Sequence, residues 1–431
     1  MNKADSERIA TLFESLGLES TDDEREAEVI LLNSCSVRQS AEDRIFGKLR
    51  DYELLRESRP NLVVGVTGCL PGRDHDGKIQ AKMPGADLFF PIRELTELPR
   101  RLAGLRPDLV QPTGETGEDY LAIAPKRDDS RHAFVTIQTG CDKFCTYCVV
   151  PYARGREASR PAADVLEEVR AAVAGGVVSV TLLGQAVNAY EAPDKDYFSP
   201  DNPYTNSFAA LLWEVNNVPG LERIWYTSAH PMHMDDEVID ALALDKFMNF
   251  LHLPAQSGSD EVLRRMNRRY DSARFLEIVR KIKERVPDMA LGTDLIVGFP
   301  GETDEQFQET VRLYEECRFD ISYTAMYSQR SGTNAARFFP DEVSRSEKKR
   351  RWHEMQALME KTVLEKNRAY LDREVEVLVD DFKRGWCLGQ SREMKLTRFR
   401  CDEDLSGRTV IVKVTKPMAW MLEGELVKTL R

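Results

Sequence analysis

The chain has 431 residues, of which 42% are hydrophobic, and carries a formal net charge of −12. This length favours about three domains, and the acidic balance argues against a protein that coats nucleic acid non-specifically, although one domain can still present a basic face. The absence of an apolar run of about 18 residues predicts no membrane span, and the polar start is not a signal peptide.

Residues 1–105 alternate helical and strand patterns, which predicts a parallel α/β domain. Apolar runs at 28–33 and 62–67 are typical of buried strands, and a helical stretch separates them. A cysteine follows each run, Cys35 after the first and Cys69 after the second. Ligands collect at the carboxyl ends of parallel strands, but two lone cysteines are by themselves more readily explained as small buried side chains.

Residues 106–131 are rich in Pro, Gly, Thr and charged residues and are predicted to form a linker. Between 132 and 369, six apolar strand candidates alternate with helix-length segments. Six repeats favour an open (β/α)6 partial barrel, whose active site lies at the carboxyl ends of the strands. The candidates are 134–138, 178–183, 223–227, 249–253, 289–297 and 320–327.

The C-terminal part begins with a charged helix expected over 344–370. Its apolar stripe of Trp352, Met355, Met359 and Val363 is expected to pack on the barrel. Residues 370–431 contain short β patterns and predict a small β-barrel. The predicted fold class is therefore α/β, with an N-terminal parallel α/β domain, a central partial barrel and a C-terminal β-barrel. The expected C-terminal strands are 375–379, 408–414 and 422–427.

Three cysteines, Cys141, Cys145 and Cys148, lie within eight residues, and no fourth cysteine follows closely. A [4Fe–4S] cluster held by three thiolates leaves one iron without a protein ligand, free to bind a small molecule. A structural zinc site normally has a fourth Cys or His, and the nearest histidine, His132, stands at an expected strand start. The spacing predicts an open iron–sulfur site, with zinc as the alternative.

The segment from Gln138 to Arg160 resembles the cluster loop of radical S-adenosylmethionine (SAM) enzymes, and within them that of the methylthiotransferases. The similarity covers Gln-Thr-Gly before the first cysteine and Val-Val-Pro-Tyr-Ala-Arg-Gly-Arg-Glu after the third. It implies that the open iron chelates the amino and carboxylate groups of the methionine moiety. One-electron cleavage of SAM then gives a 5′-deoxyadenosyl radical.

Further motifs of this family follow the later strands. The turn after the second barrel strand matches the place that meets the methionine amino group, although an ordinary βα turn explains it too. After strand four, Gln256 and Ser257 are expected at the barrel mouth, where they could meet the ribose hydroxyls. The motif after strand five resembles the strand that packs under the adenine, the end of strand six is another matching element, and no catalytic side chain is assigned. By resemblance, the residues expected to bind SAM are Tyr147, Gly184, Gln185, Gln256, Ser257, Gly298, Glu302 and Arg330.

The resemblance also implies a second, auxiliary [4Fe–4S] cluster in the N-terminal domain, with Cys35 and Cys69 among its ligands. Family members begin with a strand that ends in Gly-Cys-Gln-Met-Asn, whereas this chain starts at Met1 inside that motif. We therefore expect the first strand and the third cysteine to be missing and the auxiliary cluster to be incompletely ligated. A start codon placed too late or a truncated chain is the favoured explanation, and a divergent two-cysteine site is the alternative.

Three branches of the family compete. Residues 33–38, 46–48 and the cluster loop are most similar to the branch that converts isopentenyladenosine next to the tRNA anticodon to its 2-methylthio derivative. The other branches modify threonylcarbamoyl-adenosine in tRNA or an aspartate in a ribosomal protein. The pair His230-Pro231 resembles a Ser-x-His-Pro element of the tRNA branch, but a structural histidine is an equal explanation. An RNA-binding protein with a structural zinc is the alternative from another class.

Residues 370–431 resemble the TRAM-like RNA-binding barrel of tRNA-modifying enzymes. Their basic and aromatic residues suit phosphate contacts and base stacking, although a solvated charged face is the alternative. We expect a cytoplasmic monomer, not bound to a membrane, that acts on tRNA with a reducing electron donor. The residues concerned are Lys383, Arg384, Arg392, Lys395, Arg398 and Arg400 with Phe382, Trp386 and Phe399.

Overall fold

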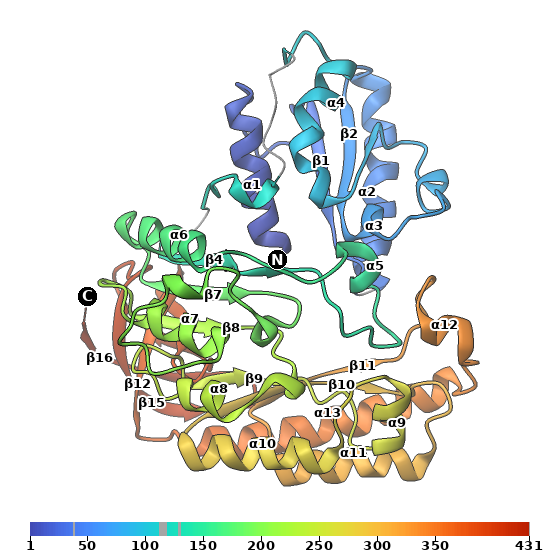
Figure 1. The fold of residues 1–431 in the computed structure, drawn as a ribbon. Coiled ribbons are helices and arrows are strands. Elements are labelled where there is room, and N and C mark those ends of the chain that lie inside the picture. Colours follow the sequence, from blue (N-terminus) through green and yellow to red (C-terminus); the bar gives the residue numbers. More distant parts are fainter. Residues whose placement is uncertain (38, 112–118, 128–130, 431) are drawn as a thin grey trace.

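The N-terminal part of the computed structural model holds a three-stranded parallel sheet in the order β1-β2-β3 (Figure 1). The structure describes residues 1–37, 39–111, 119–127 and 131–430. The two strands predicted here, β1 and β2, are present, and β3 is an additional short strand. The strands are β1 (Val29–Ser34), β2 (Val63–Gly68) and β3 (Leu88–Phe89), and the helices are α1 (Asn2–Ser15), α2 (Gln39–Ser58), α3 (Cys69–Gly72) and α4 (Leu98–Leu105).

The central strand β2 is buried along its whole length because helices cover both faces of this sheet. Its side chains alternate between two small cores. Val64 packs with Leu49 of α2, whereas Val63 packs with Leu12 of α1 and Leu102 of α4. This explains why the sequence there is a continuous apolar run.

All six strands predicted for the central part are present. They form two parallel three-stranded sheets, β4-β7-β8 and β9-β10-β11, and an isolated bridge between Ile224 and Phe247 continues from β8 toward β9. The predicted α/β class with an open (β/α)6 partial barrel is confirmed. The strands are β4 (His132–Thr136), β7 (Ser179–Leu183), β8 (Arg223–Tyr226), β9 (Phe250–His252), β10 (Ala290–Val297) and β11 (Ile321–Met326).

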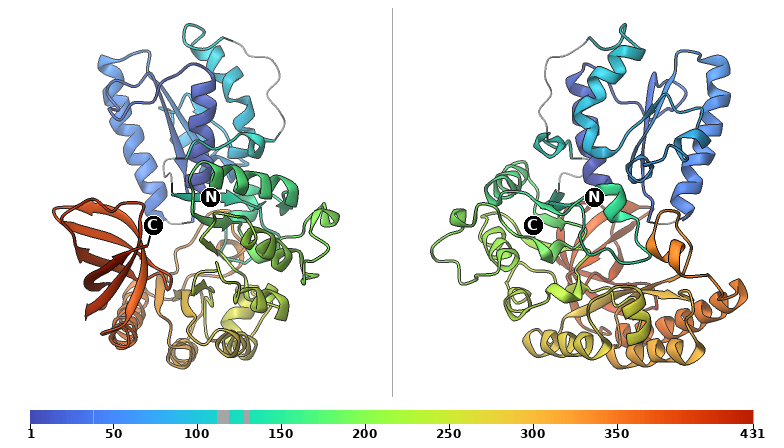
Figure 2. Two further views of the ribbon diagram at one scale, coloured as in Figure 1. Left: turned by 90° about the vertical axis from the view of Figure 1, so that its left-hand side faces the viewer. Right: turned by 45° about the vertical axis from the view of Figure 1, so that its right-hand side comes forward.

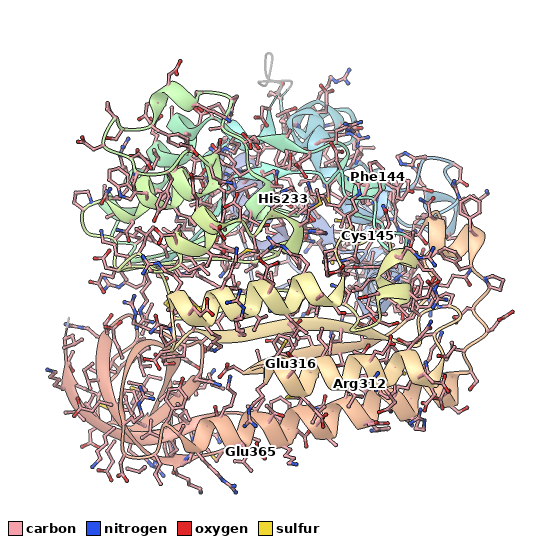
Figure 3. All side chains as sticks on the ribbon, turned by 60° about the horizontal axis from the view of Figure 1, so that its bottom comes forward. Phe144, Cys145, His233, Arg312, Glu316 and Glu365 are labelled. Atoms are coloured by element: carbon pink, nitrogen blue, oxygen red, sulfur yellow. The ribbon has the colours of Figure 1, made fainter. Side chains whose placement is uncertain are left out.

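The helices between these strands cover the outside of the partial barrel and share one hydrophobic core with it, except α9, whose Val262 packs in a separate small cluster. Several begin with a side-chain cap, as in α11, where Thr303 and Gln306 form a reciprocal capping box. Figure 3 shows α11, with Arg312 and Glu316, on the other side of the strands from Cys145. The helices are α6 (Ala162–Ala174), α7 (Ser207–Asn216), α8 (Asp236–Ala241), α9 (Asp260–Arg265), α10 (Ser272–Arg285) and α11 (Asp304–Cys317).

Short elements flank the cysteine loop and the last barrel strand. The hairpin of β5 (Gln138–Thr139) and β6 (Ala158–Ser159) brackets the loop and α5 (Val150–Arg154). Helix α12 (Asn334–Phe338) follows β11. Within the predicted linker, residues 112–118 and 128–130 lie outside the described residues, as does Arg38 of the 33–38 motif.

Helix α13 (Arg345–Arg368) crosses the outside of the partial barrel. Its predicted apolar stripe packs into the central core, where Met355, Met359 and Val363 are buried. The Trp352 indole N–H also donates a hydrogen bond to the carbonyl of Thr324 in β11 at 2.9 Å. The expected role of this helix, packing on the barrel, is confirmed.

The C-terminal part is a closed five-stranded barrel in the order β12-β13-β14-β16-β15. It lies against one side of the central barrel (Figure 2). The sequence reasoning missed β13 and β14. No described helix is long and apolar enough to cross a membrane. The strands are β12 (Glu374–Lys383), β13 (Trp386–Ser391), β14 (Leu396–Arg400), β15 (Thr409–Pro417) and β16 (Leu422–Thr429).

Candidate active site

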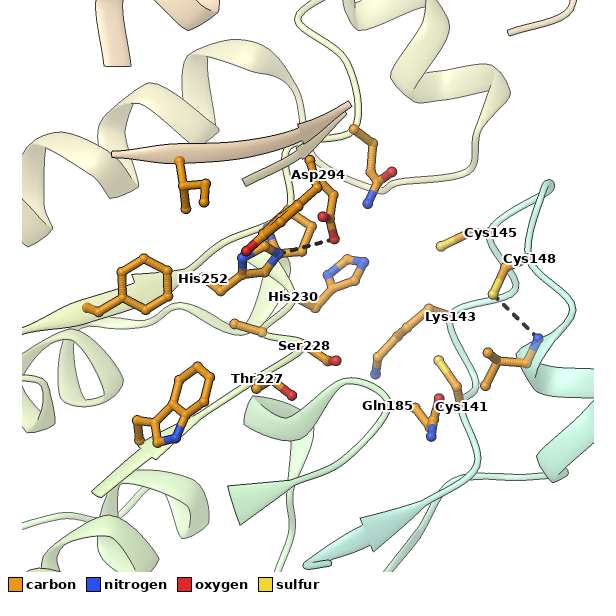
Figure 4. A pocket seen from close by; sticks show the side chains of 18 of the residues that line it. Cys141, Lys143, Cys145, Cys148, Gln185, Thr227, Ser228, His230, His252 and Asp294 are labelled. Atoms are coloured by element: carbon orange, nitrogen blue, oxygen red, sulfur yellow. Dashed lines mark hydrogen bonds and ion pairs between the residues drawn. The ribbon is translucent and has the colours of Figure 1, made fainter. Parts of the chain in front are cut away.

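The three clustered cysteines occupy the loop between β5 and α5, and Figure 4 shows their thiols together at one end of a pocket. Two thiols accept hydrogen bonds: the Val150 backbone N–H donates to Cys148 Sγ and Arg268 Nη1 donates to Cys145 Sγ, each at 3.4 Å. Such donors stabilise negative charge on sulfur, and hydrogen bonds to the sulfurs tune iron–sulfur clusters. The donor set thus fits a thiolate-bound cluster.

Burial holds the thiols of Cys141 and Cys148 protonated when no metal ion balances their charge, because it raises the pKa of both. Burial, with the adjacent thiols, raises the pKa of Cys148 to about 12. Burial also raises the pKa of Cys141 to about 11. Deprotonation in this loop is therefore favourable only together with the binding of a cation. Among the described residues, no group of three His, Cys, Asp or Glu side chains is placed to hold a single metal ion.

The pocket is a cavity of about 720 Å³ that extends from the cysteine loop across the partial barrel to the C-terminal barrel. Its walls come from the ends of β8 and β9, from β11 and from β14. Volumes of this size are typical of small-molecule sites. The cysteine end of the cavity, where Gln185, Ser228 and Gln256 follow β7, β8 and β9, agrees with the expectation that the site lies at the carboxyl ends of the strands.

Three of the eight residues predicted to bind SAM line this cavity: Tyr147, Gln185 and Gln256. Tyr147 also packs against Val262, Met266 and other members of a small apolar cluster. Ser257 points elsewhere, because its hydroxyl is hydrogen-bonded to Thr310 Oγ1 at 3.2 Å and accepts from the Ser259 N–H.

Of the other four predicted residues, Gly298, Glu302 and Arg330 have structural partners of their own. Gly184 follows β7 directly before Gln185. The Glu302 carboxylate accepts from the Gly298 N–H at 2.6 Å and pairs with Arg351 at 2.7 Å, which ties the turn after β10 to α13. Arg330 donates to Gln39 and to the carbonyl of Val37 in the N-terminal part.

Sequence reasoning assigned no role to two cations that line the cavity. Lys143 lies within the cysteine loop, 3.4 Å from Glu157, and Arg268 also donates to the carbonyl of Pro254. The position of Lys143 between two cysteines was a signal that sequence reasoning could have used. Arg268 follows α9, and only the fold places it beside Cys145.

His230 is a buried cavity residue with one ring nitrogen unpartnered among the described residues. Its Nδ1 accepts a hydrogen bond from the Met232 N–H, so the ring proton resides on Nε2. Burial, followed by the positive charge of Arg268, lowers the pKa of His230 to about 2. The neutral ring therefore presents an N–H donor, and Figure 4 shows it between Asp294 and Lys143.

The two N-terminal cysteines lie side by side at one edge of their sheet. Ser34 of β1 pairs with Gly68 of β2, so Cys35 and Cys69 follow adjacent strands in register. Helix α3, which starts at Cys69, packs closely against α5 of the cysteine loop. A Cβ on Gly72 would stand only 2.1 Å from the carbonyl oxygen of Ala153, so only glycine permits this approach.

Buried ion pairs join the N-terminal part to the central barrel. Arg154 of α5 lies 2.7 Å from Asp5 of α1. Glu168 of α6 pairs with Arg8 of α1 at 3.0 Å and with Arg160 at 2.7 Å. These contacts fix the Cys69 segment relative to the cysteine loop.

The predicted basic and aromatic set of the C-terminal barrel divides into two groups. Phe399 is in the barrel core, Lys395 pairs with Asp320 at 3.0 Å, and Arg392 donates to carbonyls of the central part. These three are structural. Arg400, with Arg398, stacks on Trp386, with its guanidinium 4.2 Å from the ring centroid. Lys383, Arg384 and Arg400 are exposed.

Two protein-family models match the chain, one over the central part and one over the N-terminal part. Residues 135–314 match the Radical SAM superfamily, and residues 1–91 match a model described as uncharacterized protein family UPF0004. A solved structure of the radical SAM methyltransferase TsrM from Kitasatospora setae superposes with a TM-score of 0.54. That similarity spans 77% of this chain and 70% of the other at 16% identity, and it concerns the fold alone. The chain is thus a radical SAM protein with a cysteine-lined cavity, and this superfamily implies a [4Fe–4S] cluster and SAM.

Curated relatives define the family more closely. Proteins named tRNA-2-methylthio-N(6)-dimethylallyladenosine synthase include one from Thermoanaerobacter sp. (strain X514), 39% identical over 100% of this chain and 91% of its own length. The relative from Bacillus subtilis (strain 168) is 40% identical over 99% of this chain and 84% of its own length. One from Bacillus cereus (strain AH187) is 41% identical over the same shares. The chain belongs to this family of radical SAM methylthiotransferases.

Proposed function

We propose that this protein methylthiolates carbon 2 of isopentenyladenosine next to the anticodon of tRNA. The observation that carries the proposal is the full-length similarity to synthases named for this reaction, together with the three cysteine thiols at the mouth of one cavity. In the overall change, the C2–H bond is replaced by C2–S–CH3. One SAM supplies the methyl group and becomes S-adenosylhomocysteine. A second SAM is cleaved to methionine and 5′-deoxyadenosine, which carries the hydrogen.

We propose that Cys141, Cys145 and Cys148 hold the radical cluster and that SAM binds beside them against Tyr147, Gln185 and Gln256. When bound, the cluster supplies the electron that cleaves SAM, and an external reducing donor restores it. Three cavity side chains support this assignment, because the amides of Gln185 and Gln256 and the ring of Tyr147 face the same space as the thiols. The remaining expected contacts, Gly184, Ser257, Gly298, Glu302 and Arg330, shape the neighbouring turns.

The chain's own residues bind, orient and shield the reactants. Arg268 and the Val150 N–H stabilise charge on the thiolates. The Nε2–H of His230 offers one hydrogen bond to an acceptor in the cavity, and the neutral ring does not add to the positive charge there. Walls from the central part and the C-terminal barrel exclude water from the radical, which is the main contribution a protein makes to such chemistry.

We propose that Cys35 and Cys69 serve an auxiliary [4Fe–4S] cluster that carries or supplies the sulfur. Their adjacent strand ends and the close approach of α3 to α5 support this role. Iron analysis after anaerobic reconstitution tests it, with Cys35→Ser and Cys69→Ser compared with Cys141→Ser. Loss of iron from the first two variants, with 5′-deoxyadenosine formation retained, is expected. Unchanged iron content in both would refute it.

We propose that the C-terminal barrel contacts the tRNA backbone through Lys383, Arg384 and Arg400, and that the protein works as a cytoplasmic monomer. Removal of residues from about 372 onward should weaken tRNA binding and flatten its salt dependence, since phosphate contacts carry that slope. Unchanged affinity would show that these residues form only a solvated face.

The decisive experiment is nucleoside analysis of tRNA from a deletion strain by mass spectrometry. The proposal expects loss of the 2-methylthio derivative and accumulation of isopentenyladenosine, restored by the wild-type gene but not by Cys145→Ala. Loss of a methylthiolated threonylcarbamoyl-adenosine, or of a modified aspartate in a ribosomal protein, would assign the chain to one of the other branches. Colourless protein with stoichiometric zinc would support the RNA-binding alternative.

A further inference from the structure

The two ends of the cavity differ sharply in polarity. The cysteine end contains the cations Lys143 and Arg268. The opposite end is apolar and is built from two separate parts of the chain: central strands and the C-terminal barrel. A smaller adjoining cavity shares five of these apolar residues and no cysteine, which confirms that they group at the junction of the two barrels. The apolar residues are Trp225, Phe250, Ile321, Met394, Leu396 and Trp420.

The strands set the distance between these ends. Ile321 is the first residue of β11, five residues before that strand ends at Met326, so at about 3.3 Å per residue it lies about 16 Å from the strand end. The Trp225 and Phe250 rings are neighbours, with centroids 6.3 Å apart. A ligand that reaches both ends must therefore be elongated, with one polar and one apolar end.

The charges around the apolar end also limit what it accepts. Among the described residues that line the cavity, the lysine and arginine side chains both belong to the cysteine end. Nearby Lys395 is already paired with Asp320. The Asp294 carboxylate, bonded to His252 at 3.1 Å, lines the middle of the cavity. A ligand carboxylate would lose its hydration here, find no cation and face a negative charge.

We propose that this apolar end holds the isopentenyl group on N6 of the substrate adenine, with C2 of the base directed toward the cysteine loop. C2 and the N6 substituent point to different sides of the purine ring, so one base can span the two ends. The inference rests on the proposed function and adds to it the part of the cavity that would select the isopentenyl group. The C-terminal barrel, which is proposed to contact the tRNA backbone, would also contact the alkyl group through Met394, Leu396 and Trp420. The charged threonylcarbamoyl group is excluded.

Leu396 offers the sharpest test because it is half-buried and belongs to no cofactor contact. Equilibrium binding is measured with anticodon stem-loop RNAs that carry adenosine, isopentenyladenosine or threonylcarbamoyl-adenosine at the same position. Wild type should bind the isopentenyl RNA about ten- to one-hundredfold more tightly than the unmodified RNA, the range that small apolar groups give in a pocket. Leu396→Lys should abolish this preference and improve the relative affinity for the threonylcarbamoyl RNA.

Two controls separate the pocket from general effects. Leu396→Met keeps an apolar side chain of similar volume and should retain the preference. Val427→Lys adds the same charge to an exposed position of the same barrel and should leave the ratio unchanged. Circular dichroism verifies that each variant is folded. Met394→Glu changes a separate position of the pocket and should also lose the preference, so the test can be completed even if Leu396→Lys misfolds.

The outcomes distinguish this inference from the proposed function. If wild type prefers the isopentenyl RNA but Leu396→Lys and Met394→Glu keep the wild-type ratio, the subsite is wrong and the function stands. If wild type shows no preference and the deletion strain keeps its methylthiolated isopentenyladenosine, the proposed function itself fails. A loss of preference in both pocket variants, with Leu396→Met and Val427→Lys unaffected, supports the assignment.

Discussion

Replacement of Asp5 by asparagine tests how the N-terminal part is anchored to the cysteine loop. Asp5 Oδ2 lies 2.7 Å from Arg154 Nη2, and the two side chains are 0% and 2% exposed. Asp5 belongs to α1, whereas Arg154 ends α5 directly after the cysteine loop. Asparagine keeps the shape of the side chain but removes its charge. The Arg154 guanidinium then stays buried without a counter-ion.

The expected cost follows from this burial. Removal of one partner of a buried ion pair costs about 3–5 kcal/mol. Arg154 keeps a second acceptor, since it also donates to Asn2 Oδ1 at 3.1 Å. We therefore expect a loss at the lower end of this range: the free energy that holds α1 in place should fall by about 3 kcal/mol. This corresponds to an approximately hundredfold increase in the open population.

Hydrogen-exchange mass spectrometry of α1 and α5 is the suitable assay, because a chain of several parts need not unfold in one step. Protection of both helices should fall about a hundredfold in Asp5→Asn. Glu284→Gln is the matched control: Glu284 pairs with Arg280 across one turn of α10, and both side chains are about 60% exposed. Such pairs contribute about 0.3–0.5 kcal/mol. A change in Asp5→Asn no larger than in this control would refute the reasoning.

Three further predictions concern the cofactor loop, a turn and the junction of the two barrels. Cys141→Ala should abolish 5′-deoxyadenosine formation, measured by liquid chromatography, because two thiolates do not retain the cluster; a normal yield would contradict the ligand assignment. Gly298→Ala should lower the melting temperature, since φ is +69° there and a Cβ would stand 2.3 Å from a lysine side chain; an unchanged melting temperature would contradict that geometry. Burial opposes the charged form of Asp320, but Lys395 and Lys366 outweigh it and lower its pKa below 3.8. The carboxylate therefore contributes stability above about pH 3.8 that is lost as the pH falls through its lower folded pKa. Asp320→Asn should flatten this acid dependence, measured by unfolding between about pH 5 and 2, and an unaltered profile would exclude the ion pair as its origin.

The strands of both α/β parts were predictable because strands buried on both faces are apolar along their own sequence. Each is a continuous apolar run between helical segments, as in β2, whose neighbours cover both faces. Strands β13 and β14 were missed. Their residues alternate weakly, with Gly389 and Thr397 on the inner face. Their pairing, of β13 with its neighbours β12 and β14 and of β14 with β16 to close the barrel, makes them β structure where their own pattern does not.

The open iron–sulfur site was likewise predictable from cysteine spacing alone. Cys141, Cys145 and Cys148 form one short segment, and the chemistry of an open cluster depends on that spacing. The sequence by itself thus determined the fold class, the family and the cofactor chemistry. Only the tertiary structure decided which side chains share the cavity. It placed Arg268 beside Cys145 and Leu396 in one cavity with Phe250, and it turned Ser257 toward Thr310. The reason is physical: contacts between residues 53 or 123 positions apart depend on how helices and sheets pack, and no local pattern records that packing.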